Sequence, residues 1–194
     1  MKKYLILIFI TGITTWHASA QNQADSGFYQ TKESLWLVKK TGAWNVIQTL
    51  RPTIDASPIT IKGIEAERTM VGAFCMHEVM QPIKGTAMPL FRRLSDLDYN
   101  LNDTHWDYIS IDTRITGGIM YFTNFGKTGD SIVSYILNFP HPGFGPQQTD
   151  RGKNVRVKTA IIFVDDDHDI VKQYWKLTDT HEWLAVQYDY TRKK

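Results

Sequence analysis

Short runs of apolar and β-branched residues, interrupted by Pro, Gly, Asn and Asp, cover the chain from Gly42 to its end. Polar and apolar residues often alternate within these runs, and no helical pattern is long enough for a crossover between parallel strands. The spacing predicts an all-β fold, an antiparallel meander that closes into a barrel or a sandwich. We place the strands near residues 43–50, 59–67, 69–81, 88–94, 105–113, 117–125, 131–139, 154–164, 169–178 and 182–191.

One short helix is expected before the first strand, from Thr31 to Lys40. Thr31 can cap its N-terminus, Glu33 lies in the first turn, Lys39 lies in the last turn, and Gly42 follows as a stop. We expect the buried side of this helix to be formed by Leu35, Trp36 and Val38.

Three polar connections between the expected strands have the composition of hairpin tips. Residues 124–130 carry two glycines, residues 165–169 are four aspartates and one histidine, and residues 178–182 are also polar. Glycine, Asn and Asp favour such turns through their backbone freedom and local hydrogen bonds. The aspartate run lacks the alternating spacing of a calcium loop, so we interpret it as a solvated turn.

The first twenty residues have the pattern of a secretory signal peptide. Lys2 and Lys3 give a cationic start, about 12 apolar residues follow, and Ala18-Ser19-Ala20 has the form that signal peptidase cuts. The apolar run is too short to span a bilayer, which takes about 20 residues. We therefore expect cleavage after Ala20, a flexible leader over residues 21–30, a barrel domain over 31–194, and a periplasmic or secreted protein.

Removing the signal peptide changes the charge of the chain. It takes away two of 22 basic residues and none of the 20 acidic ones, which leaves 20 of each. A neutral protein has no long-range field to attract nucleic acid, so we expect no nucleic-acid partner. Cys75 is the single cysteine. An internal disulfide is therefore impossible.

Two motifs at the ends of the barrel region suggest a family. Gly42-Ala43-Trp44 opens the first strand directly after the helix, and Tyr190-Thr191-Arg192 closes the last one. This pairing resembles the lipocalin-like, or calycin, β-barrels, in which Gly-x-Trp lies at the closed end beneath a basic residue of the last strand. With the stretch 106–113, residues 31–193 resemble a bacterial lipocalin-like family of unknown function. The resemblance implies a barrel of about ten strands, with Arg192 over the indole of Trp44.

Such a barrel can enclose one small ligand between its inward-facing side chains. The strand 105–113 places Trp106, Tyr108, Ser110 and Asp112 on one face, a mixture of aromatic area and polar groups that suits a pocket wall. Alternation alone leaves open whether this face points inward or to solvent. We expect the other pocket residues to be Met70, Phe74, Met76, Met120, Phe122, Tyr135 and Tyr188, with Ser110, Asp112 or Arg114 fixing a polar end.

The methionines allow two interpretations. Met70, Phe74, Met76 and Met80 share one face if a single strand without a bulge spans them. Flexible thioethers suit a pocket for variable apolar guests, and they equally suit irregular gaps in an ordinary core. A barrel completely filled by side chains, serving as an interaction module, is therefore a further possibility.

Residues 140–148 hold three prolines and two glycines, which forbid a regular element. We expect this loop to lie at the open end of the barrel and to cover the cavity, with Phe144 as its apolar contact. The alternative is a surface excursion without a role.

The function we predict is the binding of a small, largely apolar or amphipathic molecule inside the barrel, without a cofactor and without a metal site. The histidines have no spacing typical of metal ligands, and Cys75 is not placed like a catalytic nucleophile. The alternative is a barrel enzyme, an isomerase, cyclase or hydrolase. It would use Asp112, His77, Glu78 or His141 as acid and base, and these groups would have to converge in the cavity.

Overall fold

The computed structural model describes residues 31–115, 119–125, 131–143, 150–178 and 180–194. Over this part of the chain one helix precedes ten antiparallel strands, which close into a barrel in which neighbours in sequence are neighbours in space, with β1 also paired to β10. The elements are α1 (Lys32–Lys39), β1 (Gly42–Leu50), β2 (Ile59–Val71), β3 (Cys75–Pro82), β4 (Arg93–Asn100), β5 (His105–Asp112), β6 (Met120–Phe125), β7 (Ser131–Pro140), β8 (Asn154–Asp165), β9 (His168–Leu177) and β10 (Trp183–Arg192).

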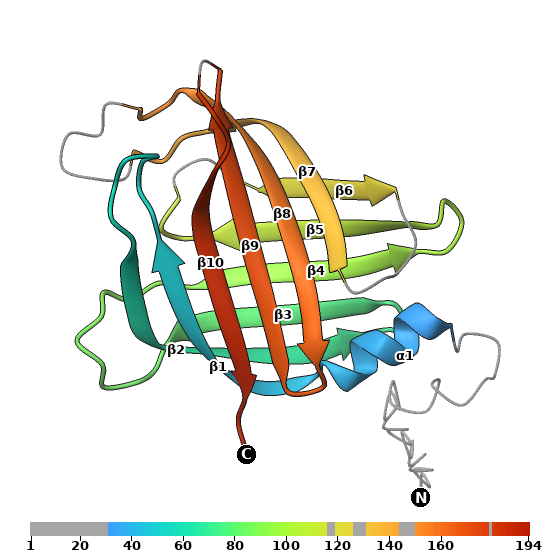
Figure 1. Ribbon diagram of the computed structural model, residues 1–194. Coiled ribbons are helices and arrows are strands. Elements are labelled where there is room, and N and C mark those ends of the chain that lie inside the picture. The colour runs from blue at the N-terminus through green and yellow to red at the C-terminus, as the bar shows by residue number, and fades with distance from the viewer. Residues whose placement is uncertain (1–30, 116–118, 126–130, 144–149, 179) are drawn as a thin grey trace, which may run out of the picture.

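The predicted all-β barrel is confirmed, and alternation builds its wall. In β8, Val155, Val157, Thr159 and Ile161 are buried, while the residues between them are more exposed. Successive strand residues point to opposite faces, so one set fills the interior and the other faces solvent. Figure 1 shows β3 to β6 running almost across the view and β8 to β10 running steeply, so that the interior lies between two walls at a large angle.

Helix α1 lies at the end of the barrel where β8 ends and β9 begins (Figure 1). Thr31 caps it as predicted, in a reciprocal capping box with Ser34. The expected buried side is wrong, because Leu35 and Val38 are about half exposed. Leu37 and Ser34 are buried instead, and the partly buried Trp36 packs on Trp106 and Phe163. Ser34, the capping-box partner of Thr31, therefore lies on the buried side of the helix with Leu37.

The expected contact between Trp44 and Arg192 is confirmed. The two residues are register partners in β1 and β10, and the guanidinium carbon of Arg192 lies 4.5 Å from the centroid of the Trp44 ring. Arg192 also donates to the carbonyl of Thr41 at 2.5 Å and forms an ion pair with Asp167 at 2.8 Å. It therefore ties the helix, the last strand and the β8–β9 turn together at the helix end of the barrel.

Two strand boundaries differ from the prediction. β2 continues through Arg68 to Val71, and the chain turns at Gly72, whose φ of +71° lies in the region that favours glycine. Arg68 does not end the strand because its side chain is buried inside the barrel. The strand expected at 88–94 is β4, which starts only at Arg93 and runs to Asn100.

The aspartate run between β8 and β9 forms a turn, as expected, but it is not entirely solvated. Asp165, Asp166 and Asp167 are exposed, whereas Asp169 is completely buried. The predicted tips at 124–130 and 178–182 join consecutive strands, although residues 126–130 and 179 lie outside the described residues.

In the described residues, the pairing of β6 with β7 has the fewest register pairs of any two neighbouring strands in the barrel wall. In the described part of these strands the register is one pair, Thr123 with Tyr135, whereas β5 and β6 share six pairs. The side-chain amide of Asn124 adds a hydrogen bond to the carbonyl of Val133. The wall is therefore least firmly joined next to the strands that carry Met120 and Phe139.

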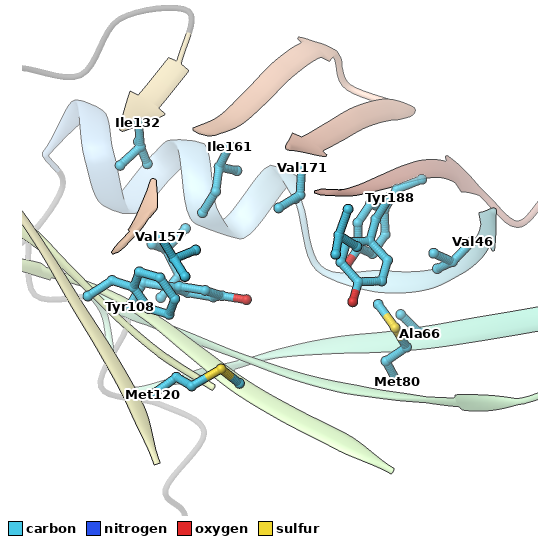
Figure 2. Close-up of a cluster of buried hydrophobic side chains, with 14 of the residues drawn as sticks. Val46, Ala66, Met80, Tyr108, Met120, Ile132, Val157, Ile161, Val171 and Tyr188 are labelled. Atoms are coloured by element: carbon cyan, nitrogen blue, oxygen red, sulfur yellow. The ribbon is translucent and has the colours of Figure 1, made fainter. Parts of the chain in front are cut away.

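The core is continuous through the barrel, and part of it is shown in Figure 2, where Tyr108 and Met120 face Val157, Ile161 and Val171 across the interior. None of the helices in the described residues is long and apolar enough to cross a bilayer.

Candidate ligand-binding site in the barrel interior

A buried ion network occupies the helix end of the interior. Arg68 forms ion pairs with Glu78 at 2.8 Å and with Asp169 at 2.5 Å, and Lys40 reaches the same Asp169 at 2.7 Å. The Tyr190 hydroxyl donates to Glu78 at 3.1 Å. The Arg68 guanidinium also lies 4.6 Å from the centroid of the Trp44 ring. Each of these charges therefore has a partner, as a charge in a low-dielectric interior requires.

The network fixes the protonation of its members. Burial alone would raise the pKa of Glu78, but Arg68 and Arg93 outweigh it and hold that pKa below its usual range. Burial would lower the pKa of Arg68, yet Glu78, Tyr190 and Asp169 raise it. Burial, followed by Glu78, raises the pKa of Tyr190 well above its usual value. At neutral pH the network therefore holds a carboxylate, a guanidinium and a neutral phenol.

The helix-side cavity lies directly beside this network. It leaves about 30 Å³ for the centre of a water-sized sphere, and one water needs about 10–15 Å³ on that measure. Its walls mix the polar network with apolar side chains, namely Arg68, Met76, Glu78, Ser95, Leu97, Tyr108, Ile161, Phe163, Val171 and Tyr190.

Arg93 occupies the middle of the interior and has a different environment from Arg68. Its Nε donates to the Ser110 hydroxyl at 3.0 Å, and its Nη2 donates to the Tyr108 hydroxyl. The guanidinium carbon lies 4.8 Å from the centroid of the Tyr188 ring. The side chain is only 2% exposed, and its Nη1 has no hydrogen-bond partner among the residues that the structure describes. Tyr108 remains a neutral donor and acceptor, because burial raises its pKa more than Arg93 lowers it.

The rim-side cavity lies on the other side of Arg93, toward the end of the barrel opposite α1. It leaves about 20 Å³ on the same measure. Its lining combines a largely aromatic wall with a polar corner and consists of Arg93, Ser110, Asp112, Ile115, Met120, Phe122, Phe139, Val157, Gln173, Trp175 and Tyr188.

A second arginine, Arg114, closes the polar corner of the rim-side cavity. It holds Asp112 through both carboxylate oxygens, with the shortest contact at 2.6 Å, and donates to the Gln48 side chain at 2.9 Å. Its guanidinium carbon lies 3.8 Å from the centroid of the Phe91 ring. Because Arg114 forms an ion pair with Asp112, the Asp112 carboxylate does not pair with Arg93, although Asp112 and Arg93 are register partners in β5 and β4.

Two buried hydroxyls, of Ser134 and Thr159, lie on the inward face of β7 and β8, near residues that line the cavities. Ser134 and Thr159 are register partners in β7 and β8, each is 1% exposed, and neither hydroxyl oxygen has a hydrogen-bond partner in the described part of the chain. Thr159 stands between Val157, which lines the rim-side cavity, and Ile161, which lines the helix-side cavity. A buried polar group without a partner costs about 1–3 kcal/mol, so such groups are rare unless a bound molecule or water satisfies them.

The structure brings most of the predicted pocket residues together and separates the others. All four residues predicted on one face of the central strand point inward. The residues that line a cavity are Met76, Tyr108, Ser110, Asp112, Met120, Phe122 and Tyr188. Trp106 packs on Trp36 and Tyr99 at the helix end, and Arg114 stands behind Asp112.

Met70 and Phe74 line neither cavity. The expectation that they share one strand face with Met76 is wrong, because the chain turns between β2 and β3 and Phe74 lies in that turn. Met70 is instead the cross-strand partner of Met76. The side chain of Tyr135 and all of Phe144 lie outside the described residues, and so does most of the loop that follows His141.

Only weak patterns in the sequence pointed to the lining residues that were missed. Arg93 and Ser95 point inward on β4. From the sequence alone, an arginine and a serine in a strand would be expected on the surface. Val157, Gln173 and Trp175 follow regular alternation on β8 and β9 and could have been included once their inward face was known.

The candidate acid and base residues do not converge. His77 lies on the outer face, where it contacts Asp96 at 2.6 Å, while Glu78 and Asp112 are each held by an arginine. His141 packs edge-on against Trp175, and burial lowers its pKa. In the described residues, no three His, Cys, Asp or Glu side chains gather in a group that could hold a metal ion.

Cys75 lies at the start of β3 and is half-buried. Burial, with smaller contributions from Asp96 and Asp98, raises its pKa to about 11. The thiol is therefore protonated at neutral pH and weakly nucleophilic.

Comparison with known proteins agrees with this architecture. The chain is similar to the structure of Rv2717c from M. tuberculosis, with 13% identity, a TM-score of 0.58, and coverage of 84% of this chain and 99% of that one. It is also similar to the S-type phycobiliprotein lyase CPES from Guillardia theta, with 10% identity, a TM-score of 0.51, and coverage of 85% and 94%. No curated protein matches the sequence. Residues 30–192 match the model of a family described as a protein of unknown function, DUF1579, and the chain therefore belongs to that family.

Proposed function

We propose that this barrel binds a small amphipathic molecule in its interior, along the line of the helix-side and rim-side cavities. The buried hydroxyls of Ser134 and Thr159 carry the proposal, because in the described residues they have no hydrogen-bond partner and they lie on the inward face that also carries Val157 and Ile161 of the two linings. A barrel that is filled only for stability gains nothing from such groups, since each costs free energy. Similarity to a phycobiliprotein lyase shows a related fold, and it makes a small-molecule ligand a reasonable class to test.

The ligand must displace side chains on entry. Typical small-molecule pockets measure about 300–1,000 Å³, far more than either cavity leaves open. Met76 and Met120 line the two cavities, and both have flexible, unbranched side chains that can repack around a guest. We therefore expect the interior to widen around the ligand, with the aromatic wall of the rim-side cavity against its apolar part.

Native mass spectrometry of protein from an exporting host tests this proposal. We expect a retained small-molecule mass on the wild-type chain and its loss in Val157→Phe, which adds a ring inside the rim-side cavity. Arg156→Phe places the same ring on the neighbouring exposed position and should keep the ligand. A clean unliganded mass for wild type, and no binding from a panel of apolar and amphipathic probes, would favour the filled barrel.

We also propose that the chain is exported and cut after Ala20. The support is the cationic start, the apolar run and the Ala18-Ser19-Ala20 site. The exported protein should begin at Gln21 by intact mass, and Ala20→Lys should retain the leader because the peptidase needs a small residue there. A mature protein that still carries Met1 would contradict this proposal.

A further inference from the structure

Among the basic side chains in or next to the barrel interior, Arg93 differs from the others in its partners. Lys40, Arg68 and Arg114 each lie within hydrogen-bond distance of a carboxylate. In the described residues no carboxylate forms an ion pair with Arg93, whose contacts are the neutral hydroxyls of Ser110 and Tyr108. A guanidinium this deeply buried is normally paired with an anion.

Arg93 combines a place in the lining of the rim-side cavity with an unpaired, buried Nη1. Within the described part of the chain Nη1 has no hydrogen-bond partner, and the side chain lines the rim-side cavity together with Ser110 and Gln173. The other donors of Arg93 hold the guanidinium in place, because Nε and Nη2 are bound to hydroxyls on the neighbouring strand β5. The free N–H groups are therefore fixed in direction before any ligand arrives, which reduces the entropy lost on binding.

We propose that Arg93 binds the carboxylate of an amphipathic monocarboxylic acid, whose apolar chain lies against the aromatic wall of the rim-side cavity. This inference rests on the proposed binding function and names the chemical class of the ligand. Nη1 donates to one carboxylate oxygen, and the Ser110 hydroxyl lies beside it as a second polar group. Charge-assisted hydrogen bonds of this kind are about twice as strong as neutral ones. The apolar contacts come from Met120, Phe122, Phe139, Val157 and Trp175.

The nearby acidic side chains of the protein do not pair with Arg93. Asp112 is the cross-strand neighbour of Arg93, but Arg114 binds both of its oxygens. Glu78 is bound by Arg68 and Tyr190, so its influence on Arg93 is electrostatic only. A ligand carboxylate therefore meets a guanidinium that no protein carboxylate already holds.

Titration calorimetry with octanoate, octan-1-ol and octylammonium tests the inference on the mature chain. The three probes share one apolar chain and differ in the head group. We expect octanoate to bind wild type at least about tenfold more tightly than octan-1-ol, with octylammonium the weakest. Arg93→Met keeps the length and apolar stem and should abolish this preference. Arg92→Met changes the adjacent, outward-facing arginine and should preserve it.

The outcomes separate the two proposals. Binding of octan-1-ol as tightly as octanoate to wild type, or an unchanged preference in a folded Arg93→Met protein, overturns the carboxylate site and leaves interior binding intact. If Arg93→Met does not fold, Arg93→Lys replaces it. A lysine retains the charge without the fixed guanidinium and should weaken octanoate binding more than octan-1-ol binding. Failure of all three probes to bind, together with a clean unliganded mass, overturns both proposals.

Discussion

Arg68 and Arg93 determine the character of the barrel interior. Both are almost completely buried and lie near two aromatic rings, yet Arg68 also has two carboxylates beside it, whereas Arg93 has two hydroxyls. The first arginine belongs to a satisfied structural network. Arg93 retains an unused hydrogen-bond donor in a buried, low-dielectric environment.

Removing Arg68 should destabilise the barrel strongly, because Glu78 loses its ion pair and Asp169 loses one of two. We expect Arg68→Met to lower the free energy of unfolding by about 3–5 kcal/mol in urea titrations. Lys193→Met, which breaks a part-exposed ion pair with Glu65, should cost at most about 1 kcal/mol. Equal midpoints for the two variants would show that the buried network is not required for stability.

His141 should make stability depend on pH. Burial lowers its pKa, opposed by Asp150 and assisted by Lys153, and its Nδ1 accepts a hydrogen bond from the Gly143 N–H that a protonated Nδ1 could not accept. The unfolded chain therefore binds the proton first. The stability from the neutral ring is complete above pH 6.5 and declines as pH falls below it, by about 1.4 kcal/mol per unit of pKa difference.

Urea titrations at pH 7.5 and 5.5 check this sign. The loss of stability on acidification should be smaller in His141→Phe than in wild type. The exposed His181→Gln should behave like wild type. A larger loss in His141→Phe would mean that the imidazolium, and not the neutral ring, is favoured in the folded state.

At the level of elements, α1 joins the barrel through a narrow contact. Leu37 is completely buried, whereas Leu35, two residues earlier, is 48% exposed. The two leucines occupy the same short helix and have the same helix propensity, so they form a matched pair in which burial is the main difference.

We expect Leu37→Ala to lower the free energy of unfolding by about 2–5 kcal/mol, because it removes buried apolar area and leaves a cavity. Leu35→Ala should change it by about 0.5 kcal/mol or less, as surface substitutions usually do. Urea unfolding followed by tryptophan fluorescence measures both. Similar losses for the two variants would contradict the observed orientation of the helix.

The elements also show what the sequence could and could not predict. Alternation correctly grouped Trp106, Tyr108, Ser110 and Asp112 on one face of β5, and the structure shows that this face points inward. It failed for β4, because Arg93 and Ser95 point inward and Asp96 points outward, so no apolar face is visible. A buried charge also explains why the expected strands 59–67 and 69–81 placed a break at Arg68, which lies within β2. A buried charged residue breaks the rule that inward-facing strand residues are apolar. Its partners come from other strands of the barrel, so they become visible only in the folded structure.

At the scale of the whole molecule, the two ends of the barrel differ. The helix end is filled by the Trp44–Arg192 contact and the ion network, whereas the rim-side cavity lies toward the other end. The Gly-x-Trp motif and the terminal arginine were enough to predict the closed end. The candidate site needed the fold, because its lining comes from seven strands that are far apart in sequence.

The sparse seam between β6 and β7 has a consequence for motion. With one register pair and one side-chain bond in the described residues, few backbone hydrogen bonds must break for the two strands to separate locally. The amides of Tyr121 and Thr123 should therefore exchange with deuterium faster than those of Ile161 and Val171, in the densely paired β8 and β9. Exchange measured by NMR at neutral pH checks this expectation, and equal protection would contradict it.

Met120 and Phe122 of β6 and Phe139 of β7 line the rim-side cavity on either side of that seam. Transient separation of β6 and β7 would then expose the barrel interior through the wall. A guest could enter sideways, between two strands, while both ends of the barrel keep their shape.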